Sequence, residues 1–197
     1  MTDYCTVADV KADGRLDITG TEYDATLAEL VTAASRWIDQ YCCAGISNAF
    51  AAGDADTAVR YYDAAAIVRS TLHLDAPLLA VDAITNGDGA GVTSGYRLEP
   101  LNGQTFRRVK MLSTGPGWTF PTDASEIAIT GVWGLSASTP PAIREACAML
   151  AGWMFKRYQT ALADASANVE LGQLVYGESM PRQVVAILDT YRESYLV

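Results

Sequence analysis

The sequence predicts an α+β fold in which helices from both ends of the chain form one core and an antiparallel β unit is inserted between them. Apolar residues recur at helical spacing over residues 22–43 and again over residues 139–162, whereas β-prone segments separated by turn residues fill the middle. We place the helical core in residues 1–56 and 137–197 and the β unit in residues 57–136, within a single structural domain overall.

The first long helix is expected over residues 22–43, after one short helical turn at residues 6–11. Its apolar side chains recur every three or four residues and therefore share one face. They are Leu27, Leu30, Val31, Ala34, Trp37, Ile38, Tyr41 and Cys42. Thr21 and Asp24 resemble a capping box at the start of this helix.

The middle of the chain is expected to form five or six antiparallel strands after a loop at residues 44–57. The β-prone positions are Val59, Tyr61, Ile67, Leu72 and Leu74, followed by segments 78–85, 96–98, 106–112 and 126–133. The run Asn86-Gly-Asp-Gly89 marks a turn between two of these strands.

Helix returns after Thr139, where Pro140 and Pro141 suit a first turn because a missing N–H costs nothing there. Its apolar stripe is expected to comprise Ile143, Cys147, Leu150, Ala151, Met154, Phe155, Tyr158 and Leu162. Residues 164–179 lack a clear period and are expected to form a loop. Pro181 then opens a last helix. We expect Trp37 and Phe155 to lie on facing apolar stripes in the core.

The chain has a net charge of −9, of which −7 falls in residues 1–56. Such a chain is not expected to grip a phosphate backbone, because affinity for nucleic acid comes largely from Lys and Arg displacing counterions. Residues 1–14 lack the basic and apolar regions of a signal peptide. The longest nearly apolar run, residues 146–155, is too short to span a bilayer, so we expect no membrane segment and synthesis in a cytoplasm.

Most enzyme classes are disfavoured because the parts of their active sites are missing. His73 is the only histidine, and it lies on an expected strand. Cys5, Cys42, Cys43 and Cys147 show no metal-ligand spacing and are expected to be reduced core residues. The glycines of segment 87–91 fit a hairpin turn and not a phosphate-binding loop. We therefore assign no catalytic residue, no cofactor and no metal.

One basic cluster, Arg107, Arg108 and Lys110, allows two interpretations. Arg108 and Lys110 share a strand face, which could contact phosphate or an acidic neighbour. A solvated edge strand gives the same pattern, because charged edges discourage aggregation.

The order of segments resembles the phage head-tail connector (adaptor) family, in the long form that carries a β insertion and that also occurs in gene transfer agents. The resemblance extends over nearly the whole chain. It is carried by Trp37-Ile-Asp-Gln-Tyr41, segment 72–84, Tyr96-Arg-Leu-Glu-Pro100, Ile127-Ala-Ile-Thr-Gly-Val-Trp-Gly134, Pro140-Pro-Ala-Ile-Arg144 and Pro181-Arg-Gln-Val-Val185. The chain departs from the family in two places: it has Gly131-Val-Trp-Gly134 where a Gly-Tyr pair is common, and Lys156-Arg-Tyr158 where many members carry Arg-Glu.

The resemblance implies a structural protein of the virion neck and not an enzyme. Its copies would form a ring, usually of twelve, between the portal protein and a stopper or other tail-proximal neck protein. DNA would pass through the ring without specific binding. Two alternatives stay open: another neck, head-completion or tail-completion protein, and a bacterial enzyme or ligand-binding domain.

The last helix is the candidate docking surface for the portal or for a neighbouring subunit, because its apolar stripe and flanking arginines suit a helix that lies in a groove. The candidate interface residues are Arg182, Val184, Leu188, Tyr191, Arg192 and Tyr195. The alternative is that this helix closes the core of its own subunit.

Overall fold

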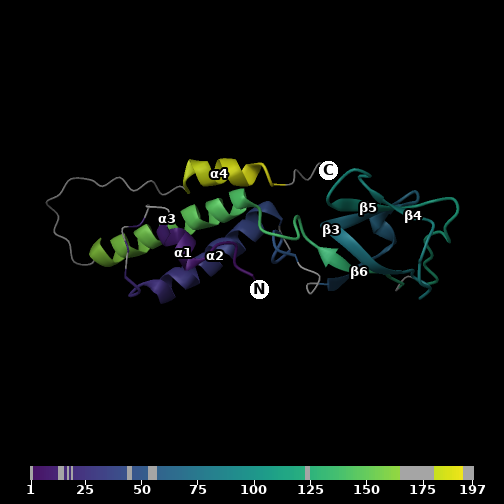
Figure 1. The fold of residues 1–197 in the computed structure, drawn as a ribbon. Helices are drawn as coiled ribbons and strands as arrows, with labels where there is room; N and C mark the ends of the chain where they lie inside the picture. Colours follow the sequence, from purple (N-terminus) through teal and green to yellow (C-terminus); the bar gives the residue numbers. More distant parts are fainter. Residues whose placement is uncertain are drawn as a thin grey trace. The chain divides into compact units, whose positions relative to one another are not determined.

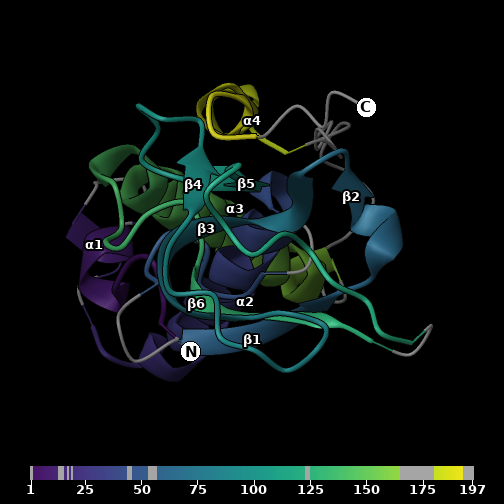
Figure 2. The same cartoon turned by 90° about the vertical axis from the view of Figure 1, so that its right-hand side faces the viewer.

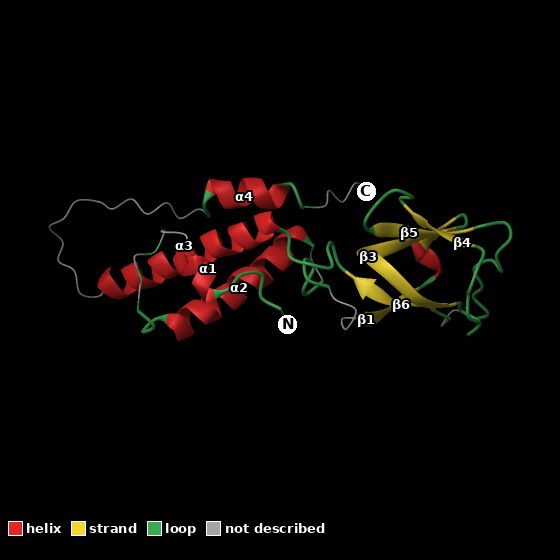
Figure 3. Ribbon diagram, in the orientation of Figure 1, coloured by secondary structure: helices red, strands yellow, loops and turns green. Residues whose placement is uncertain are grey.

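The computed structural model describes residues 2–12, 16, 18, 20–43, 46–52, 57–122, 125–164 and 180–192. The chain forms two compact units, one from Met1–Ser47 with Thr139–Val197 and one from Asn48–Ser138. The first unit holds the α-helices and the second holds the β-sheet (Figure 1, Figure 3). The predicted α+β fold, with an antiparallel β unit inserted into a helical core, is confirmed.

Four α-helices make up the described part of the helical unit: α1 (Val7–Ala12), α2 (Asp24–Cys42), α3 (Pro141–Asp164) and α4 (Arg182–Asp189). Helix α3 packs against α2, and α4 packs against both. Most of the buried side chains lie on the apolar stripes that the sequence predicts, but Tyr158, which was predicted on the stripe of α3, is 43% exposed, and Ser35 and Asp39 of α2 are buried outside the predicted stripe. The buried residues on the stripes include Leu27, Val31, Ala34 and Ile38 of α2, and Ile143, Cys147, Leu150, Ala151 and Phe155 of α3. Within the predicted loop at 164–179, Asp164 ends α3, and residues 165–179 lie outside the described residues.

One of the two predicted core aromatics is not in the core. Phe155 is completely buried and packs edge-on against Tyr23, with ring centres 5.4 Å apart. Trp37 is only half-buried and stacks on Tyr41, one helical turn further along α2, at 4.9 Å. The prediction for Trp37 was wrong because the apolar stripe of α2 is wider than the surface that α3 and α4 cover.

The chain before α2 is held by polar contacts that the periodicity of apolar residues does not reveal. The Tyr4 N–H donates to Ser35 Oγ at 3.0 Å, and the Tyr4 hydroxyl donates to Asp39. Thr6 and Asp9 form a reciprocal capping box at α1, since the Thr6 N–H donates to the Asp9 carboxylate (2.7 Å) and the Asp9 N–H donates to Thr6 Oγ1 (3.1 Å). The capping box predicted at Thr21 does not form, because α2 begins without a side-chain cap.

Six strands form one antiparallel sheet: β1 (Thr57–Tyr62), β2 (Ile67–Val68), β3 (Thr71–Thr85), β4 (Tyr96–Glu99), β5 (Phe106–Met111) and β6 (Ile127–Trp133). The order across the sheet is β1-β6-β3-β5-β4, with β2 paired to the start of β3 (Figure 2). The buried face includes Leu72, Leu78, Val109, Ile127 and Ile129. The sheet therefore has β1 and β4 at its edges and β5 in its interior.

Strand β3 differs from its prediction, because two segments that the sequence separates are one strand of 15 residues. Its first part pairs with β5 and its second part with β6. The register with β5 shifts between His73 and Leu78, where Pro77 interrupts the alternating pattern. A proline removes one backbone donor, and the strand continues through it with three consecutive buried residues, Ala76, Pro77 and Leu78.

The two ends of the β unit are joined by backbone hydrogen bonds. The Ala52 N–H donates to Ser136 O at 3.1 Å, and the Leu135 N–H donates to Ala49 O at 2.6 Å. Ala49 and Phe50 are completely buried. Residues that look like a loop from their composition thus close the β unit, and the unit begins at Asn48 and ends at Ser138.

All four cysteines are free and buried. Cys5 Sγ donates to Cys147 Sγ at 3.1 Å, and this contact, together with burial, raises the pKa of the Cys5 thiol. Burial also raises the pKa of Cys42 to about 12. These two thiols stay protonated near neutral pH, and the thiol form is a poor nucleophile.

The different burial of the two aromatics can be tested by truncation. Phe155→Ala should lower the free energy of unfolding by about 3–5 kcal/mol, because it removes a completely buried ring. Trp37→Ala should cost only about 1–2 kcal/mol, since the ring is half-buried and loses one stacked pair. Urea unfolding of both variants measures this difference, and equal losses would contradict the partial burial of Trp37.

The burial of the thiols predicts slow alkylation. In the native protein at pH 7.5, iodoacetamide should modify the four cysteines much more slowly than in urea, because burial removes them from solvent and the pKa values of Cys5 and Cys42 are raised. Intact mass measured over time gives the number of added groups. Rapid modification of the native chain would contradict the burial of the thiols.

The protein is also expected to need no disulfide and no metal. An unfolding midpoint that falls when reductant or EDTA is added would contradict this expectation.

Candidate functional site

His73 is exposed on β3, and its side chain makes no hydrogen bond or ion pair within the described ranges. No group of three or more His, Cys, Asp or Glu side chains in the described part of the chain is arranged to hold a metal. The turn after β3 is built around buried Asn86, whose side-chain oxygen accepts from the Gly87 and Thr119 N–H groups at 3.1 and 3.0 Å. That turn is structural, as its sequence predicts.

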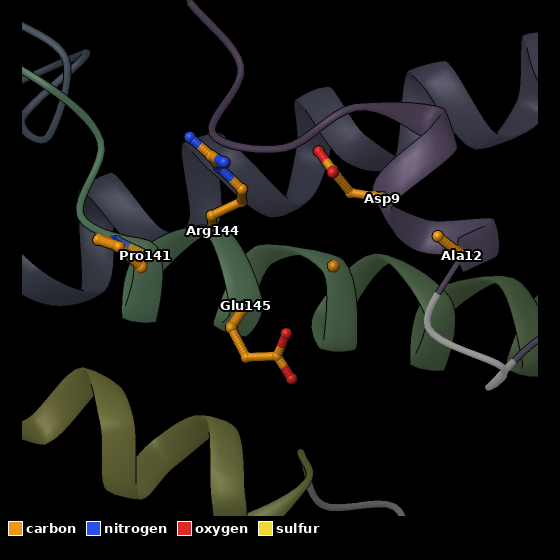
Figure 4. Close-up of a pocket in the computed structure, with 6 residues that line it drawn as sticks. Asp9, Ala12, Pro141, Arg144 and Glu145 are labelled. Atoms are coloured by element: carbon orange, nitrogen blue, oxygen red, sulfur yellow. The ribbon is translucent and has the colours of Figure 1, made fainter.

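A cavity of about 260 Å³ lies beside α1 and the start of α3 (Figure 4). It is lined by Asp9, Ala12, Pro141, Arg144, Glu145 and Ala148. The Asp9 carboxylate is occupied by the capping box, and the hydrogen bonds from Thr6 hold its pKa below the ordinary value. The other charged side chains of the lining are Arg144 and Glu145, and no serine, cysteine or histidine is among its six lining residues.

A second cavity, of about 530 Å³, lies in the β unit between the start of β3 and the chain that follows β5. Arg69, Met111 and Trp118 are among its lining residues. The Trp118 indole N–H donates to the Ser70 carbonyl at 3.0 Å, which fixes the ring. The cavity combines the cation of Arg69 with serines and apolar side chains, and none of its described lining residues is an acid or a histidine.

Helix α4 shows that part of the predicted docking surface is core. Val184 and Leu188 are completely buried, on a helix that packs against α2 and α3. Their placement corrects the assignment of these two side chains to an interface, because the apolar stripe covers the helical unit itself. Arg182 is exposed at the start of α4.

The end of α4 is fastened to α2. Tyr41 donates to the Asp189 carboxylate at 2.7 Å, and the Arg192 guanidinium lies 5.2 Å from the centre of the Tyr41 ring. Tyr191 is half-buried and Arg192 is exposed. Tyr195 lies outside the described residues. Of the candidate interface, the structure therefore leaves Arg182, Arg192 and the open part of Tyr191 on the surface of the chain.

The predicted basic cluster divides between the two faces of the sheet. Val109 is completely buried, so Arg108 and Lys110, its neighbours on β5, lie on the outer face. Arg107 belongs to the same face as Val109. Because β5 is an interior strand between β3 and β4, the edge-strand explanation of these charges was wrong.

Strand β4 adds two charges to this outer face that sequence reasoning missed. Arg97 lies directly opposite Lys110, and Glu99 lies directly opposite Arg108. Glu99 accepts from Arg97 at 2.7 Å and lies 3.6 Å from Arg108. The bond from Arg97, with the nearby charges of Arg108 and Lys110, holds the pKa of Glu99 below its ordinary value. We call Arg97, Glu99, Arg108 and Lys110 the cationic face.

The described helices include none that is long and apolar enough to cross a membrane. No protein-family model matches the chain, and no curated protein matches it.

Solved structures do match the fold. A chain of the neck of an empty GTA particle, computed with C6 symmetry, is 20% identical with a TM-score of 0.60, and the match covers 97% of this chain and 90% of that one. A chain of the neck of a native GTA particle, computed with C12 symmetry, gives 18% identity and a TM-score of 0.56, with coverage of 97% and 92%. A chain from the virion of the native gene transfer agent (GTA) particle gives 20% identity and 0.56, with coverage of 97% and 90%. At this level of identity, the similarity shows that the chain shares its fold with these particle proteins.

Proposed function

We propose that this protein is a structural head-tail adaptor in the neck of a long-tailed phage or of a phage-like particle such as a gene transfer agent. The observation that carries the proposal is the match of almost the whole chain, helical unit and β insertion together, to chains of GTA particles, two of them from the neck. A shared fold alone does not fix function. The proposal therefore rests on the extent of the match, which includes both the helices and the inserted sheet.

In this proposal, copies of the chain form a ring between the portal protein and a stopper or another tail-proximal neck protein, and DNA passes through it. The ring would hold twelve copies, in keeping with the C12 symmetry of one neck that the fold matches. The protein would be made in the host cytoplasm and would end in the virion. The net charge of −9 would allow DNA to slide without adhering.

Electron microscopy of the purified protein, alone and mixed with a candidate portal protein from the same source, tests the proposal. We expect closed rings, or collars attached to one end of the portal. A chain that stays monomeric and leaves the portal bare in both samples would overturn the adaptor function. Binding at the far end of the neck and not to the portal would favour a stopper or tail-completion protein instead.

The exposed part of α4 is the proposed docking surface for the portal or the neighbouring subunit. Arg182→Glu with Arg192→Glu should abolish attachment and lower the unfolding midpoint only slightly, because both side chains are exposed and the contact of Arg192 with the Tyr41 ring lies at the surface. Val184→Ala is the matched control on the buried side, and it should lower stability by about 1–3 kcal/mol and keep attachment. Co-sedimentation with the portal and a urea melt separate the two effects.

Truncation before α4 gives a second measurement of the same helix. A chain that ends at Glu178 should unfold at lower urea concentration than the full chain, because it loses the buried Val184 and Leu188. For the arginine variant of the preceding test, full attachment of Arg182→Glu with Arg192→Glu to the portal would show that the docking surface lies elsewhere on the chain.

A further inference from the structure

The cationic face is an unusual feature in a chain of net charge −9. Its three cations and one carboxylate come from two neighbouring strands, so they sum to +2 on one side of the sheet. The side chains of Arg97 and Arg108 are 39% and 47% exposed. The patch therefore presents positive charge to solvent.

The arrangement is not the one that would best stabilise the isolated sheet. Arg97 and Lys110 are directly opposite each other, and like charges at opposed positions destabilise an antiparallel pair. Glu99 is paired with Arg97 and lies near Arg108, whereas it acts on Lys110 only at longer range, and Lys110 makes no ion pair within the described residues. A carboxylate arriving from outside would relieve this repulsion.

The helical unit carries a surface of the opposite sign. Glu22 in the turn before α2 and Glu29 within α2 are exposed, and neither makes an ion pair within the described ranges. Asp24 between them is paired with Lys11. We call Glu22 and Glu29, with the Asp24–Lys11 pair, the acidic end of α2, and its formal charge is −2.

We propose that the cationic face of one copy of this protein binds the acidic end of α2 of the next copy, and that this contact helps to close the ring. The inference rests on the proposed function, because a ring of identical subunits needs two different and complementary surfaces on each copy. The two faces meet this requirement, since they lie on different units of the chain and carry charges of +2 and −2. The β insertion would then act as a bridge to the neighbouring subunit.

A second copy fits the cationic face better than DNA does. Duplex DNA binding relies on many Lys and Arg contacts to phosphate, and here Glu99 stands among only three cations. The rest of the chain is acidic and would repel the phosphate backbone. A small number of carboxylates from a neighbour matches the number of charges on the face.

Charge reversal and its rescue test the contact. Arg108→Glu with Lys110→Glu should raise the protein concentration needed for ring assembly at least about tenfold, because two surfaces that attract each other become repulsive. Glu22→Lys with Glu29→Lys should weaken it in the same way. The protein that carries all four substitutions has the wild-type net charge, and it should recover assembly. Arg108→Lys with Lys110→Arg keeps the charge and should assemble normally.

Mass photometry and negative-stain microscopy count the rings, and circular dichroism confirms that each variant is folded. Assembly of the wild type should also fall as NaCl rises from 0.1 to 1 M, because salt screens exposed charges. If the wild type forms rings and both reversed variants do so equally well, or if the fourfold variant shows no recovery, this contact is excluded while the adaptor function stands. A wild type that forms no ring, even with the portal protein, removes both proposals.

The nucleic-acid outcome is measured in parallel by fluorescence anisotropy with a 30-base-pair duplex. The wild type should bind no more tightly than about 10⁻⁴ M, the weak end of nonspecific binding. Micromolar, salt-sensitive binding that is lost in the Arg108→Glu, Lys110→Glu variant would reassign the cationic face to DNA and overturn the contact between copies.

Discussion

The packing of α2 against α3 is the contact on which the helical unit depends, and it joins the two parts of the chain that the β insertion separates. These two helices flank the β insertion in the sequence, so the helical unit forms only if they pack together although 98 residues separate them. Their contact is secured by complete burial of Ile38 and Leu27 on one side and of Leu150 and Phe155 on the other. The β unit has its own closure, in the hydrogen bonds from Leu135 and Ser136 to Ala49. Each unit is therefore complete in its own contacts, which is how a chain can carry an insertion without losing its core.

The β unit depends in the same way on one strand. Strand β3 pairs with β2, β5 and β6, and it brings together segments that lie far apart in the sequence. Gly131 of β6 fits against it because a side chain there would collide with the Ala80 carbonyl. This close approach gives a physical reason for one glycine of the Gly131-Val-Trp-Gly134 motif. On its other side β6 neighbours β1, and there the Trp133 indole N–H donates to Ala58 O of β1 at 2.9 Å.

Helices and strands with a regular period could be predicted from the sequence, and the features that depend on long-range contacts could not. The stripe of α3 was visible because Ile143, Cys147 and Leu150 repeat within one element. The half-burial of Trp37 and the burial of Val184 depend on how much of α2 the other two helices cover, which no local pattern contains. For the cationic face, the alternation of side chains along a strand was enough to place Arg108 and Lys110 on the same face of β5. The neighbouring charge of Glu99 required the register of β4, which is set by the whole sheet.

The uneven charge of the chain gains a physical meaning if the protein works as a ring. Identical subunits that each carry −9 repel one another, and this repulsion grows with the number of copies. A ring can tolerate this repulsion if opposite charges face each other across each subunit contact. Salt screens exposed charges that lie more than about 8 Å apart, so the attraction within a close pair outweighs the repulsion between distant like charges. Negative charge concentrated in residues 1–56 and a cationic face confined to β4 and β5 provide such a local match. The same distribution keeps the total negative, so that assembly by charge and weak adhesion to DNA are compatible in one sequence.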